Sequence, residues 1–350
     1  MNAIRALSQR HDPGRAVDPS QVEPRTGRLV DGFGRRFHYL RLSVTEVCNF
    51  RCAYCLPDGF LKTAPLSFLG IEEIARLTRA FALLGVAKVR LTGGEPTVRG
   101  DIGEIIARVA ATPGIDKVAM TTNGWNLHRH VAAWRAAGLT NLNISIDDLD
   151  AATFAAITGH DRLDQVVAGL DAALALGMRA VKVNAVLLKA SVPEGFGRFA
   201  AFVKARPIAV RFIELMRTGE NADYFVANHV SGAVLKAWLE ERGWSARPRA
   251  FDDGPAIEYE HPDYLGRIGL IAPYGAGFCD SCNRLRVTAR GKLRLCLFGE
   301  GGVDLRDLLT DDQPGAVVAR VTAALVGKSA GHRLHEEHPG DTRHLAQLGG

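Results

Sequence analysis

The chain has 350 residues, a formal net charge of +5, 47% hydrophobic residues and 23% charged residues. This balance is typical of a globular protein, and there is no apolar run of about 18 residues that would predict a membrane helix. The modest positive charge favours an anionic partner, either a nucleic acid or a small polyphosphate. No apolar signal sequence follows the first methionine, so we expect a cytoplasmic protein.

Residues 1–35 are rich in charged residues, proline and glycine and lack apolar periodicity, which predicts a flexible N-terminal extension. From residue 36 onward, strand-like and helical patterns alternate. The expected strands are Phe37–Val44, Ala87–Thr92, Lys117–Thr122, Asn141–Asp147, Arg179–Leu188 and Ile208–Leu215. Two of the helices between them are expected at Ile71–Leu84 and Leu163–Leu176. The alternation predicts an α/β fold, a partial (β/α)6 TIM-like barrel over residues 36–217.

After residue 217 the rhythm changes. The expected elements are a helix at Ser231–Arg242, strands at Ala256–Glu260, Arg267–Ile271, Leu285–Ala289 and Lys292–Cys296, and a helix at Pro314–Val326. Arg290-Gly291 favours a hairpin turn between the last two strands. We therefore expect a smaller α+β C-terminal domain at residues 218–340, which closes the open side of the barrel, and a tail at residues 341–350.

The six cysteines form two triplets, and in an intracellular chain such cysteines favour metal binding or catalysis over disulfides. Cys48, Cys52 and Cys55 have the spacing C-x3-C-x2-C directly after the first expected strand, at the barrel end that carries the chemistry. Three thiolates can bind three irons of a [4Fe–4S] cluster and leave the fourth iron open to a substrate. The alternative is a zinc site with a distant fourth ligand.

The second triplet is Cys279, Cys282 and Cys296. Structural zinc stays open as an alternative here, because C-x2-C pairs are common in zinc ribbons. Arg284 and Arg286 follow the pair at alternating positions and so share one face of a strand. An open cluster beside two arginines suits an anion that also offers a nitrogen donor, such as a nucleoside triphosphate.

Other strand ends carry small polar residues. Gly93-Gly94-Glu95, Thr121 and Ser145 follow or end three expected strands, and by themselves they are equally compatible with turns and helix caps. Arg90 and Lys182 alone would be interpreted as members of strand-end ion pairs.

Two further groups of residues resemble functional motifs, but their sequence context does not support a functional role. Gly327-Lys328-Ser329 lacks the upstream glycine of a phosphate loop and follows a helix. His332, His335 and His338 could bind a metal ion, but their spacing fits no zincin pattern, so we expect them to lie in a solvated tail.

Because Tyr54 precedes the last cysteine of the first triplet, the motif resembles the signature of the radical S-adenosylmethionine superfamily. The resemblance implies a [4Fe–4S] cluster that binds S-adenosylmethionine and cleaves it reductively to a 5′-deoxyadenosyl radical. By the same resemblance, the residues expected to contact S-adenosylmethionine are Tyr54, Gly93, Gly94, Glu95, Ser145 and Met216.

The segment from Cys279 to Gly302, with Cys-Asn-Arg-Leu-Arg and Leu-Cys-Leu-Phe-Gly-Glu-Gly-Gly, closely resembles the GTP 3′,8-cyclase family of molybdenum cofactor biosynthesis. The resemblance covers about residue 36 to the terminal Gly349-Gly350, which in the family reaches into the active site. It implies a lyase that converts GTP to (8S)-3′,8-cyclo-7,8-dihydroguanosine 5′-triphosphate, with guanine bound at a second [4Fe–4S] cluster. The residues that match the family's GTP contacts are Arg41, Arg90, Thr121, Lys182, Arg284, Leu285 and Arg286, of which Arg41, Arg284 and Arg286 are expected to be catalytic.

The resemblance also implies partners. These are an electron donor such as flavodoxin or ferredoxin, a second copy in a homodimer, and a downstream cyclic pyranopterin monophosphate synthase that receives the product; neither a nucleic acid nor a membrane is expected. Two other functions would also use such cysteines. A radical S-adenosylmethionine peptide-modifying enzyme with an auxiliary cluster would usually carry more C-terminal cysteines. A zinc-stabilised nucleic-acid-binding protein would require zinc and salt-dependent affinity.

Overall fold

The computed structural model describes residues 29–62, 66–249 and 254–349. Most of the expected N-terminal extension, residues 1–28, lies outside these ranges, as does the last glycine. Within the described ranges, no helix has the length and apolar character needed to cross a membrane.

The first half of the fold alternates strands and helices. In chain order its main elements are β1 Tyr39–Thr45, α1 Ile71–Leu83, β2 Lys88–Gly93, α2 Ile102–Ala110, β3 Lys117–Thr122, α3 Leu127–Ala136, β4 Asn141–Ser145, α4 Ala151–Thr158, α5 Leu163–Ala175, β5 Ala180–Leu187, α6 Glu194–Lys204 and β6 Ala209–Glu214. The expected barrel strands and helices are thus confirmed, and the third strand has the expected bounds.

The second half contains shorter strands. Its main elements are α7 Ala222–Asn228, α8 Gly232–Glu240, β7 Ser245–Ala246, β8 Ile257–Glu260, β9 Arg267–Ile271, β10 Arg284–Val287, β11 Lys292–Arg294, β12 Val303–Asp304 and α9 Pro314–Leu325. The expected hairpin is present, because β10 and β11 pair antiparallel and Gly291 has a φ of 88° in the turn.

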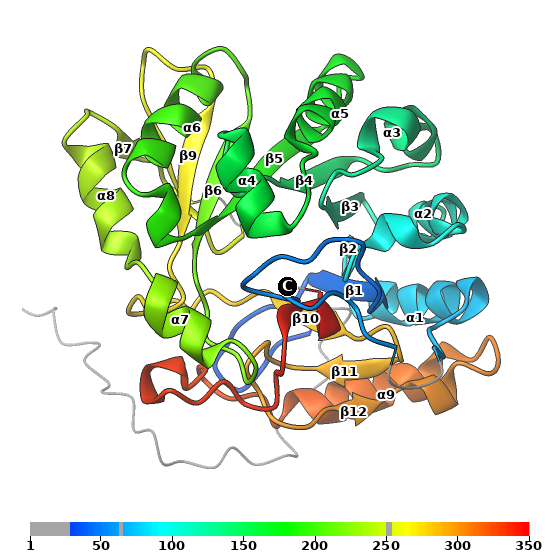
Figure 1. Ribbon diagram of the computed structural model, residues 1–350. Helices are drawn as coiled ribbons and strands as arrows, with labels where there is room; N and C mark the ends of the chain where they lie inside the picture. The colour runs from blue at the N-terminus through cyan, green and yellow to red at the C-terminus, as the bar shows by residue number, and fades with distance from the viewer. Residues whose placement is uncertain (1–28, 63–65, 250–253, 350) are drawn as a thin grey trace, which may run out of the picture.

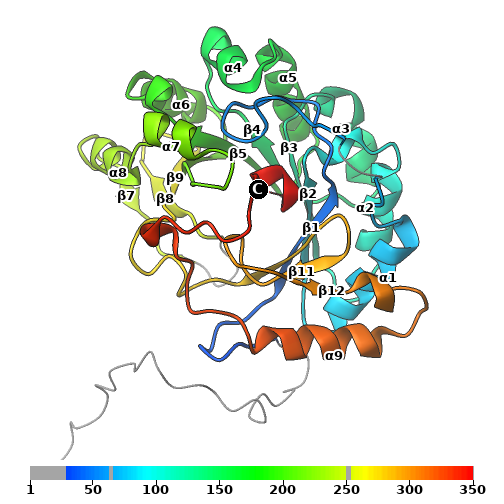
Figure 2. The same ribbon diagram turned by 60° about the horizontal axis from the view of Figure 1, so that its bottom comes forward.

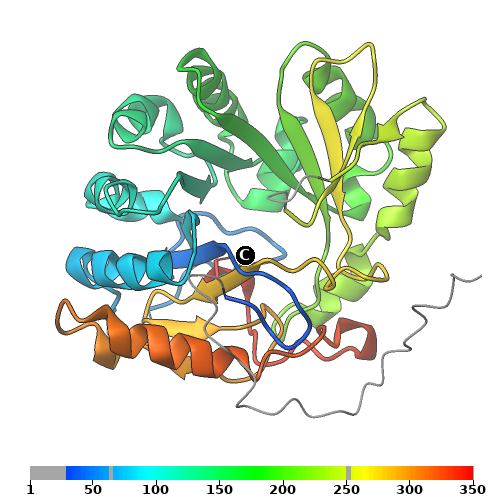
Figure 3. The ribbon, with the colours of Figure 1, turned by 180° about the vertical axis from the view of Figure 1, so that it is seen from behind.

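In the described chain the strands form one sheet in the order β12-β11-β10-β1-β2-β3-β4-β5-β6-β9-β8-β7. Strands β1 to β6 are parallel neighbours, with helices on their outer side (Figure 1). The strands of the second half extend both edges of this sheet: β10 pairs parallel with β1, and β9 pairs parallel with β6. The barrel therefore stays open between β12 and β7, and α9 lies beside α1 (Figure 3).

The alternation of β1 explains how the sheet separates core from cavity. Leu40, Leu42 and Val44 are fully buried in the main hydrophobic core, and each contributes roughly 1.5–3 kcal/mol through its burial. Neighbouring side chains of a strand point to opposite faces. Tyr39 and Arg41 accordingly line an interior cavity. The chain's C-terminal end lies inside the ring of strands and helices (Figure 2).

One boundary differs from the sequence-based expectation. The extension was expected to reach residue 35, but Leu29 and Arg35 are buried and the N–H of Leu29 donates to the carbonyl of Leu84. Val30 and Arg36 form an isolated antiparallel bridge. Local composition missed this packing because the partners of the segment lie far along the chain.

Candidate active site

The first cysteine triplet lies in the loop after β1, and backbone contacts fix that loop to the end of α4. The N–H of Arg51 donates to the carbonyl of Thr158 at 3.1 Å, and that of Ala53 to the carbonyl of Ile157 at 2.9 Å. Phe50 is buried and stacks on His160, with ring centroids 4.8 Å apart. These contacts hold the loop across the carboxyl ends of the strands.

The three thiols of this triplet face one cavity of about 170 Å³. They form no disulfide. Burial raises the pKa of Cys48 to about 12 and that of Cys55 to about 11, and it places that of Cys52 well above its ordinary value. The thiols therefore hold their protons until a cationic metal group replaces them. Three sulfur donors facing one cavity fit the [4Fe–4S] cluster that the spacing predicted.

All six residues expected to contact S-adenosylmethionine line the same cavity: Tyr54, Gly93, Gly94, Glu95, Ser145 and Met216. The structure gives the two glycines a packing reason as well. A Cβ on Gly93 would lie 2.2 Å from the carbonyl oxygen of Thr45, and one on Gly94 would lie 2.4 Å from that of Val47. Only glycine lets β2 pass this close to the loop that carries the cysteines.

Glu95 has partners within the protein. Its Oε1 accepts from the hydroxyls of Thr97 and Thr122 at 2.6 and 2.7 Å, and its Oε2 accepts from the N–H of Asn123 at 2.6 Å. Burial raises the pKa of this carboxyl group, and the hydrogen bonds oppose that rise. Glu95 thus ties the ends of β2 and β3 together. Its expected contact with S-adenosylmethionine stays a prediction.

Tyr54 is fixed from the opposite wall. Its hydroxyl donates to the carboxylate of Asp147 at 3.0 Å, and that carboxylate also accepts from the N–H of Val186 at 2.9 Å. Burial raises the pKa of Asp147 to about 6. This contact links the cysteine loop to the ends of β4 and β5.

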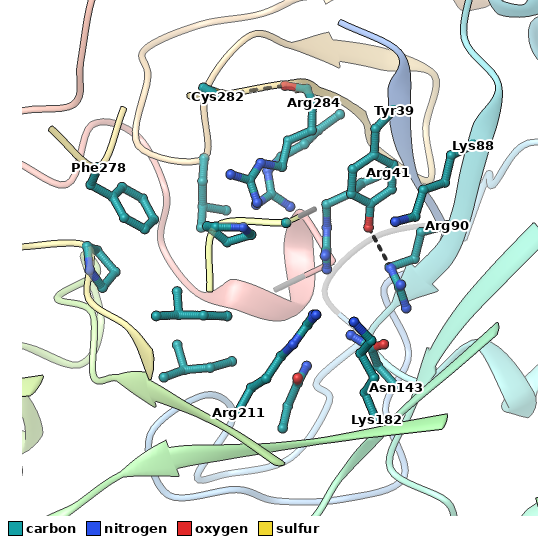
Figure 4. A pocket seen from close by; sticks show the side chains of 18 of the residues that line it. Tyr39, Arg41, Lys88, Arg90, Asn143, Lys182, Arg211, Phe278, Cys282 and Arg284 are labelled. Carbon is teal, nitrogen blue, oxygen red and sulfur yellow. Dashed lines mark hydrogen bonds between the residues drawn. The ribbon is translucent and has the colours of Figure 1, made fainter. Parts of the chain in front are cut away.

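A larger cavity of about 310 Å³ adjoins the first, with Asn184, Ile213 and Met216 lining both. Its cationic lining residues are Arg41, Lys88, Arg90, Lys117, Arg179, Lys182, Arg211, Arg284 and Arg286. Figure 4 labels Arg41, Lys88, Arg90, Lys182, Arg211 and Arg284 among the side chains that line the cavity. Among the described residues that line it, there is no aspartate or glutamate. This concentration of positive charge in a concave site attracts an anion of high charge.

Strand register brings the cations together. Arg41 of β1 lies opposite Arg90 of β2 on one side and Arg286 of β10 on the other. Two residues earlier in β1, Tyr39 lies between Lys88 of β2 and Arg284 of β10. Because parallel neighbours present the same face, residues far apart in the sequence line one wall.

The cations perturb one another's proton affinity. Burial, followed in size by the charge of Arg41, lowers the pKa of Arg286 to about 9. Burial, followed in size by the charge of Arg211, lowers the pKa of Lys182 to about 8. Burial alone would raise the pKa of Tyr39, but the charges of Arg90 and Arg41 bring it down to about 6. The Nε of Arg90 donates to this phenol oxygen at 2.5 Å (Figure 4). A bound polyanion would relieve this repulsion.

Glu258 does not line the cavity, but it balances part of this charge by pairing with two of the lining cations. Its Oε1 accepts from Nη2 of Arg211 at 2.7 Å and from Nζ of Lys182 at 3.4 Å. Burial opposes ionisation, but the charges of Lys182 and Arg211 outweigh it and lower the pKa of Glu258 to about 2.

The second triplet lies at the other end of the larger cavity, where Cys279, Cys282 and Cys296 all contribute to the lining. They are free thiols. Burial raises the pKa of Cys282, but Arg284 and Lys328 outweigh it, so the net pKa falls below its ordinary value. A thiol with a lowered pKa beside an open space fits a metal ligand, whereas burial raises the pKa of Cys279.

In the described chain, no group of three or more His, Cys, Asp or Glu side chains is arranged to hold a metal ion. The case for a cluster at either triplet therefore depends on the shared cavity, the sulfur donors and the sequence pattern.

The C-terminal tail lines the smaller cavity through Leu345 and Ala346 and contacts an arginine of the larger one. Nη2 of Arg41 donates to the carbonyl oxygen of Gly349 at 2.5 Å, and the backbone N–H groups of Leu345 and Ala346 face the Cys55 thiol. The tail thus touches the loop of the first triplet and the cationic wall together.

Five of the expected GTP contacts, Arg41, Arg90, Lys182, Arg284 and Arg286, line the larger cavity. Thr121 lines the smaller one instead and receives a hydrogen bond from Arg90 at 3.3 Å. Leu285 is fully buried in the core because it occupies the opposite face of β10. Only its backbone is left to contact a ligand there.

The sequence interpretation missed several lining residues. Tyr39, Lys88, Arg211 and Asn184 occupy alternating positions of the barrel strands, and that alternation could have identified them. His332 was expected in a solvated tail, but it lines the larger cavity beside Cys279, so that expectation was wrong. Its place follows from long-range packing that spacing does not reveal.

Comparison with known proteins agrees with this geometry. The sequence profile of the Radical SAM superfamily matches residues 42–203, and that described as Molybdenum Cofactor Synthesis C matches residues 208–334. The crystal structure of SuiB from Streptococcus suis bound to S-adenosylmethionine superposes with a TM-score of 0.56 at 14% identity, covering 90% of this chain and 77% of that chain. At that identity it is the fold alone that is shared.

The open parallel barrel with a C-x3-C-x2-C loop at its strand ends therefore defines a radical S-adenosylmethionine protein. The chain is 56% identical over 324 residues to a GTP 3′,8-cyclase of Stenotrophomonas maltophilia, covering 92% of this chain and 99% of the relative. It is 54% identical over 326 residues to one of Cronobacter sakazakii, with 92% and 99% covered. The chain belongs to the GTP 3′,8-cyclase family.

Proposed function

We propose that this chain is a radical S-adenosylmethionine lyase of molybdenum cofactor biosynthesis that converts GTP to (8S)-3′,8-cyclo-7,8-dihydroguanosine 5′-triphosphate. The observation that carries the proposal is a cationic cavity that is lined by the second cysteine triplet and adjoins the cavity of the first triplet. Its Lys and Arg side chains suit a triphosphate, and the residues that line both cavities support a nucleotide position next to the first triplet.

At the first site, Cys48, Cys52 and Cys55 would hold a [4Fe–4S] cluster. When bound, this cluster supplies the electron that cleaves S-adenosylmethionine and so provides a hydrogen-abstracting radical. The protein's part is to hold the two ligands in contact and to exclude water, which also keeps the radical from side reactions. Tyr54, bonded to Asp147, fixes the wall of this site.

At the second site, Cys279, Cys282 and Cys296 would hold a second [4Fe–4S] cluster that binds the guanine base. Arg284 and Arg286 follow two of these cysteines on the same wall of the cavity. Arg41 joins them through the register of β1 and β10. These three side chains are proposed to bind the nucleotide, where fixed positive charge stabilises negative charge without reorganisation.

The proposal includes a cytoplasmic location, a reductant of the flavodoxin or ferredoxin class, a homodimer and transfer of the product to a cyclic pyranopterin monophosphate synthase. These follow from family membership. The alternative of peptide modification is not favoured, because the relatives of high identity are GTP 3′,8-cyclases.

The test is an anaerobic reconstitution with iron and sulfide, followed by reduction and addition of S-adenosylmethionine with GTP, ATP, CTP or UTP in turn. We expect 5′-deoxyadenosine and a cyclised nucleotide in equal amounts with GTP only. Formation of 5′-deoxyadenosine at the same rate without GTP, or metal analysis that finds zinc alone, would contradict the proposal.

A Cys282→Ala variant separates the two sites. It should retain the iron and the spectrum of the first cluster and lose production of the cyclised nucleotide. Unaltered turnover in this variant would remove the role assigned to the second triplet.

A further inference from the structure

The short segment before β1 contains a buried ion pair that fixes an arginine. Asp31 accepts hydrogen bonds from the N–H groups of Phe33 and Arg35, each at 3.0 Å, and from Nε of Arg35 at 2.7 Å. The two charged side chains are 0% and 5% exposed. A charge buried this deeply persists only with full hydrogen bonding, so the remaining donors of Arg35 need acceptors.

Those acceptors are three backbone carbonyls near the second cysteine triplet. Nη1 of Arg35 donates to the carbonyl of Cys279 at 3.1 Å and to that of Ala330, and Nη2 donates to the carbonyl of Ser329 at 2.7 Å. The planar guanidinium holds its donors in a fixed fork. It thereby joins the loop of Cys279 to the chain that follows α9.

A second buried cation acts on the other side of the triplet. Lys328 is 6% exposed and donates from Nζ to the carbonyl of Leu295, the residue before Cys296. Its ammonium group also lies 5.2 Å from the ring centroid of Phe37, within the range of a cation–π contact. The Gly327-Lys328-Ser329 segment, which is no phosphate loop, thus has a structural partner.

The two cations hold one short piece of chain from both sides. Residues 328–330 bond to Arg35 through two carbonyls and, through the Lys328 side chain, to Leu295, the residue before Cys296. The next residues also touch the triplet: the N–H of His332 faces the Cys279 thiol, and a Cβ on Gly331 would lie 3.7 Å from its sulfur. The backbones of Cys279 and Cys296 are thereby fixed relative to each other.

We propose that Arg35 and Lys328 are positioning residues of the second cysteine site, which hold the backbones of Cys279 and Cys296 so that the three thiols face one cavity before a cluster binds. This rests on the proposed function only in that the triplet binds a [4Fe–4S] cluster. Preformed ligands lose less entropy on binding. Two buried cations beside the thiolates also favour the net negative charge of a cluster with three thiolate ligands.

The test uses the full-length chain with Cys48, Cys52 and Cys55 changed to alanine, so that any cluster must occupy the second site. Into this parent we place Arg35→Gln, Lys328→Met or, as the matched control, Arg36→Gln. Arg36 belongs to the same segment but its side chain is exposed. After anaerobic reconstitution, iron and sulfide per chain, the electron paramagnetic resonance spectrum and the rate of iron loss to a chelator are measured.

We expect the parent and the Arg36→Gln control to bind about four irons. Arg35→Gln and Lys328→Met should retain less than half as much, or lose it at least tenfold faster, with an altered spectrum. Equal loading, spectrum and release rate in both variants would overturn the inference. A parent without iron would instead contradict the second cluster of the proposed function.

A merely structural role is distinguished in chains that keep the first triplet. There both variants should load the first cluster and bind S-adenosylmethionine as the unmodified chain does. Loss of both clusters together in Lys328→Met, or an unfolded circular dichroism spectrum, would mean that the contacts of Arg35 and Lys328 support the whole fold. That result would overturn a role specific to the second site. Lys328→Met decides the outcome if Arg35→Gln does not fold.

Discussion

The guanidinium of Arg41 donates a hydrogen bond of 2.5 Å to the carbonyl oxygen of Gly349. The same carbonyl accepts from the hydroxyl of Thr92 at 3.2 Å. An arginine expected to contact the substrate is therefore also held by the end of the chain. Movement of the tail and binding of an anion at this wall are coupled, because both use the donors of Arg41.

Replacement of Gly349 by alanine tests this coupling. Gly349 has a φ of 68°, and its added Cβ would lie 2.2 Å from Cγ2 of Thr92, so the tail must shift away from the wall. A displacement of about 1 Å near a reacting centre costs roughly 100-fold in rate. We expect turnover of GTP to fall by about that factor, measured as cyclised nucleotide per chain, while cluster content is unchanged.

Gly177→Ala is the matched control. Gly177 has a similar φ of 62°, but nothing lies within 4 Å of its added Cβ. It therefore carries the backbone strain of a positive φ, about 1 kcal/mol or somewhat more, without a clash. Equal loss of activity in both variants would show that backbone strain, and not displacement of the tail, is responsible.

The cationic wall predicts opposite effects on binding and on stability. Nη1 of Arg286 is buried and has no hydrogen-bond partner in the described chain, and its neighbours Arg41 and Arg284 repel it. Arg286→Met removes a charge and keeps the length of the side chain. We expect the melting temperature of the free protein to stay or rise, and GTP to bind about 10- to 100-fold more weakly, as for loss of about 1.5–3 kcal/mol.

The exposed Arg129→Met, remote in α3, is the control for net charge. Arg129→Met should change neither the melting temperature nor the affinity for GTP beyond a small, salt-screened effect of the lost charge. A fall in melting temperature with unchanged GTP affinity for Arg286→Met would assign that arginine a structural role instead.

Lys182 predicts a pH dependence of GTP binding. Burial and the charge of Arg211 lower its pKa to about 8, so its positive charge is present below pH 8 and lost as the pH rises through that value. The last ionisation of a phosphate group lies near about 6 and does not interfere. We expect the affinity for GTP to fall between pH 7 and pH 9.5, by up to about tenfold per unit above the pKa.

Lys182→Arg should remove the part of the decline that is centred near pH 8, because a guanidinium keeps its proton to higher pH than an ammonium group. The part that Arg286 contributes above its pKa of about 9 should persist. Calorimetric titrations at five pH values compare the two proteins. A decline of the same steepness in the variant would assign the titration to another group.

The sequence predicted much of the fold because the barrel strands are short, apolar and regularly spaced. Lys117–Thr122 and Arg267–Ile271 have the expected bounds. Cysteine spacing identified both metal-ligand candidates. Pairing between distant segments was not predictable in this way: no local pattern indicates that β10 adds to β1 in parallel, or that Arg35 reaches the carbonyl of Cys279.

The same limit applies within the site. Arg284 and Arg286 were identified because they adjoin a cysteine motif. Arg211 and Tyr39 complete the cavity but adjoin no motif, and only the register of the sheet brings them to the wall. A residue whose function depends on facing two sites at once is harder still to predict from sequence.

Asn184 is such a residue. It lies in β5 opposite Arg211 of β6 and lines both cavities. Its Oδ1 is buried and has no hydrogen-bond partner among the described residues, which leaves an acceptor at the junction of the two cavities, where we expect the sugar of GTP. Since an unpaired buried acceptor costs about 1–3 kcal/mol, a ligand hydroxyl that donates to it gains that amount.

Asn184→Leu keeps the size of the side chain and removes the acceptor. The phosphate-binding cations are untouched, so we expect GTP affinity to fall only by the about 5- to 150-fold that 1–3 kcal/mol represents, whereas the sugar is held less well for reaction. The measurement is the ratio of 5′-deoxyadenosine to cyclised nucleotide. We expect several molecules of 5′-deoxyadenosine per cyclised nucleotide instead of one, because cleavage of S-adenosylmethionine is no longer coupled to cyclisation. Asn141→Leu, which alters the larger cavity alone, should retain the ratio of one, and a ratio of one in both variants would refute the position assigned to Asn184.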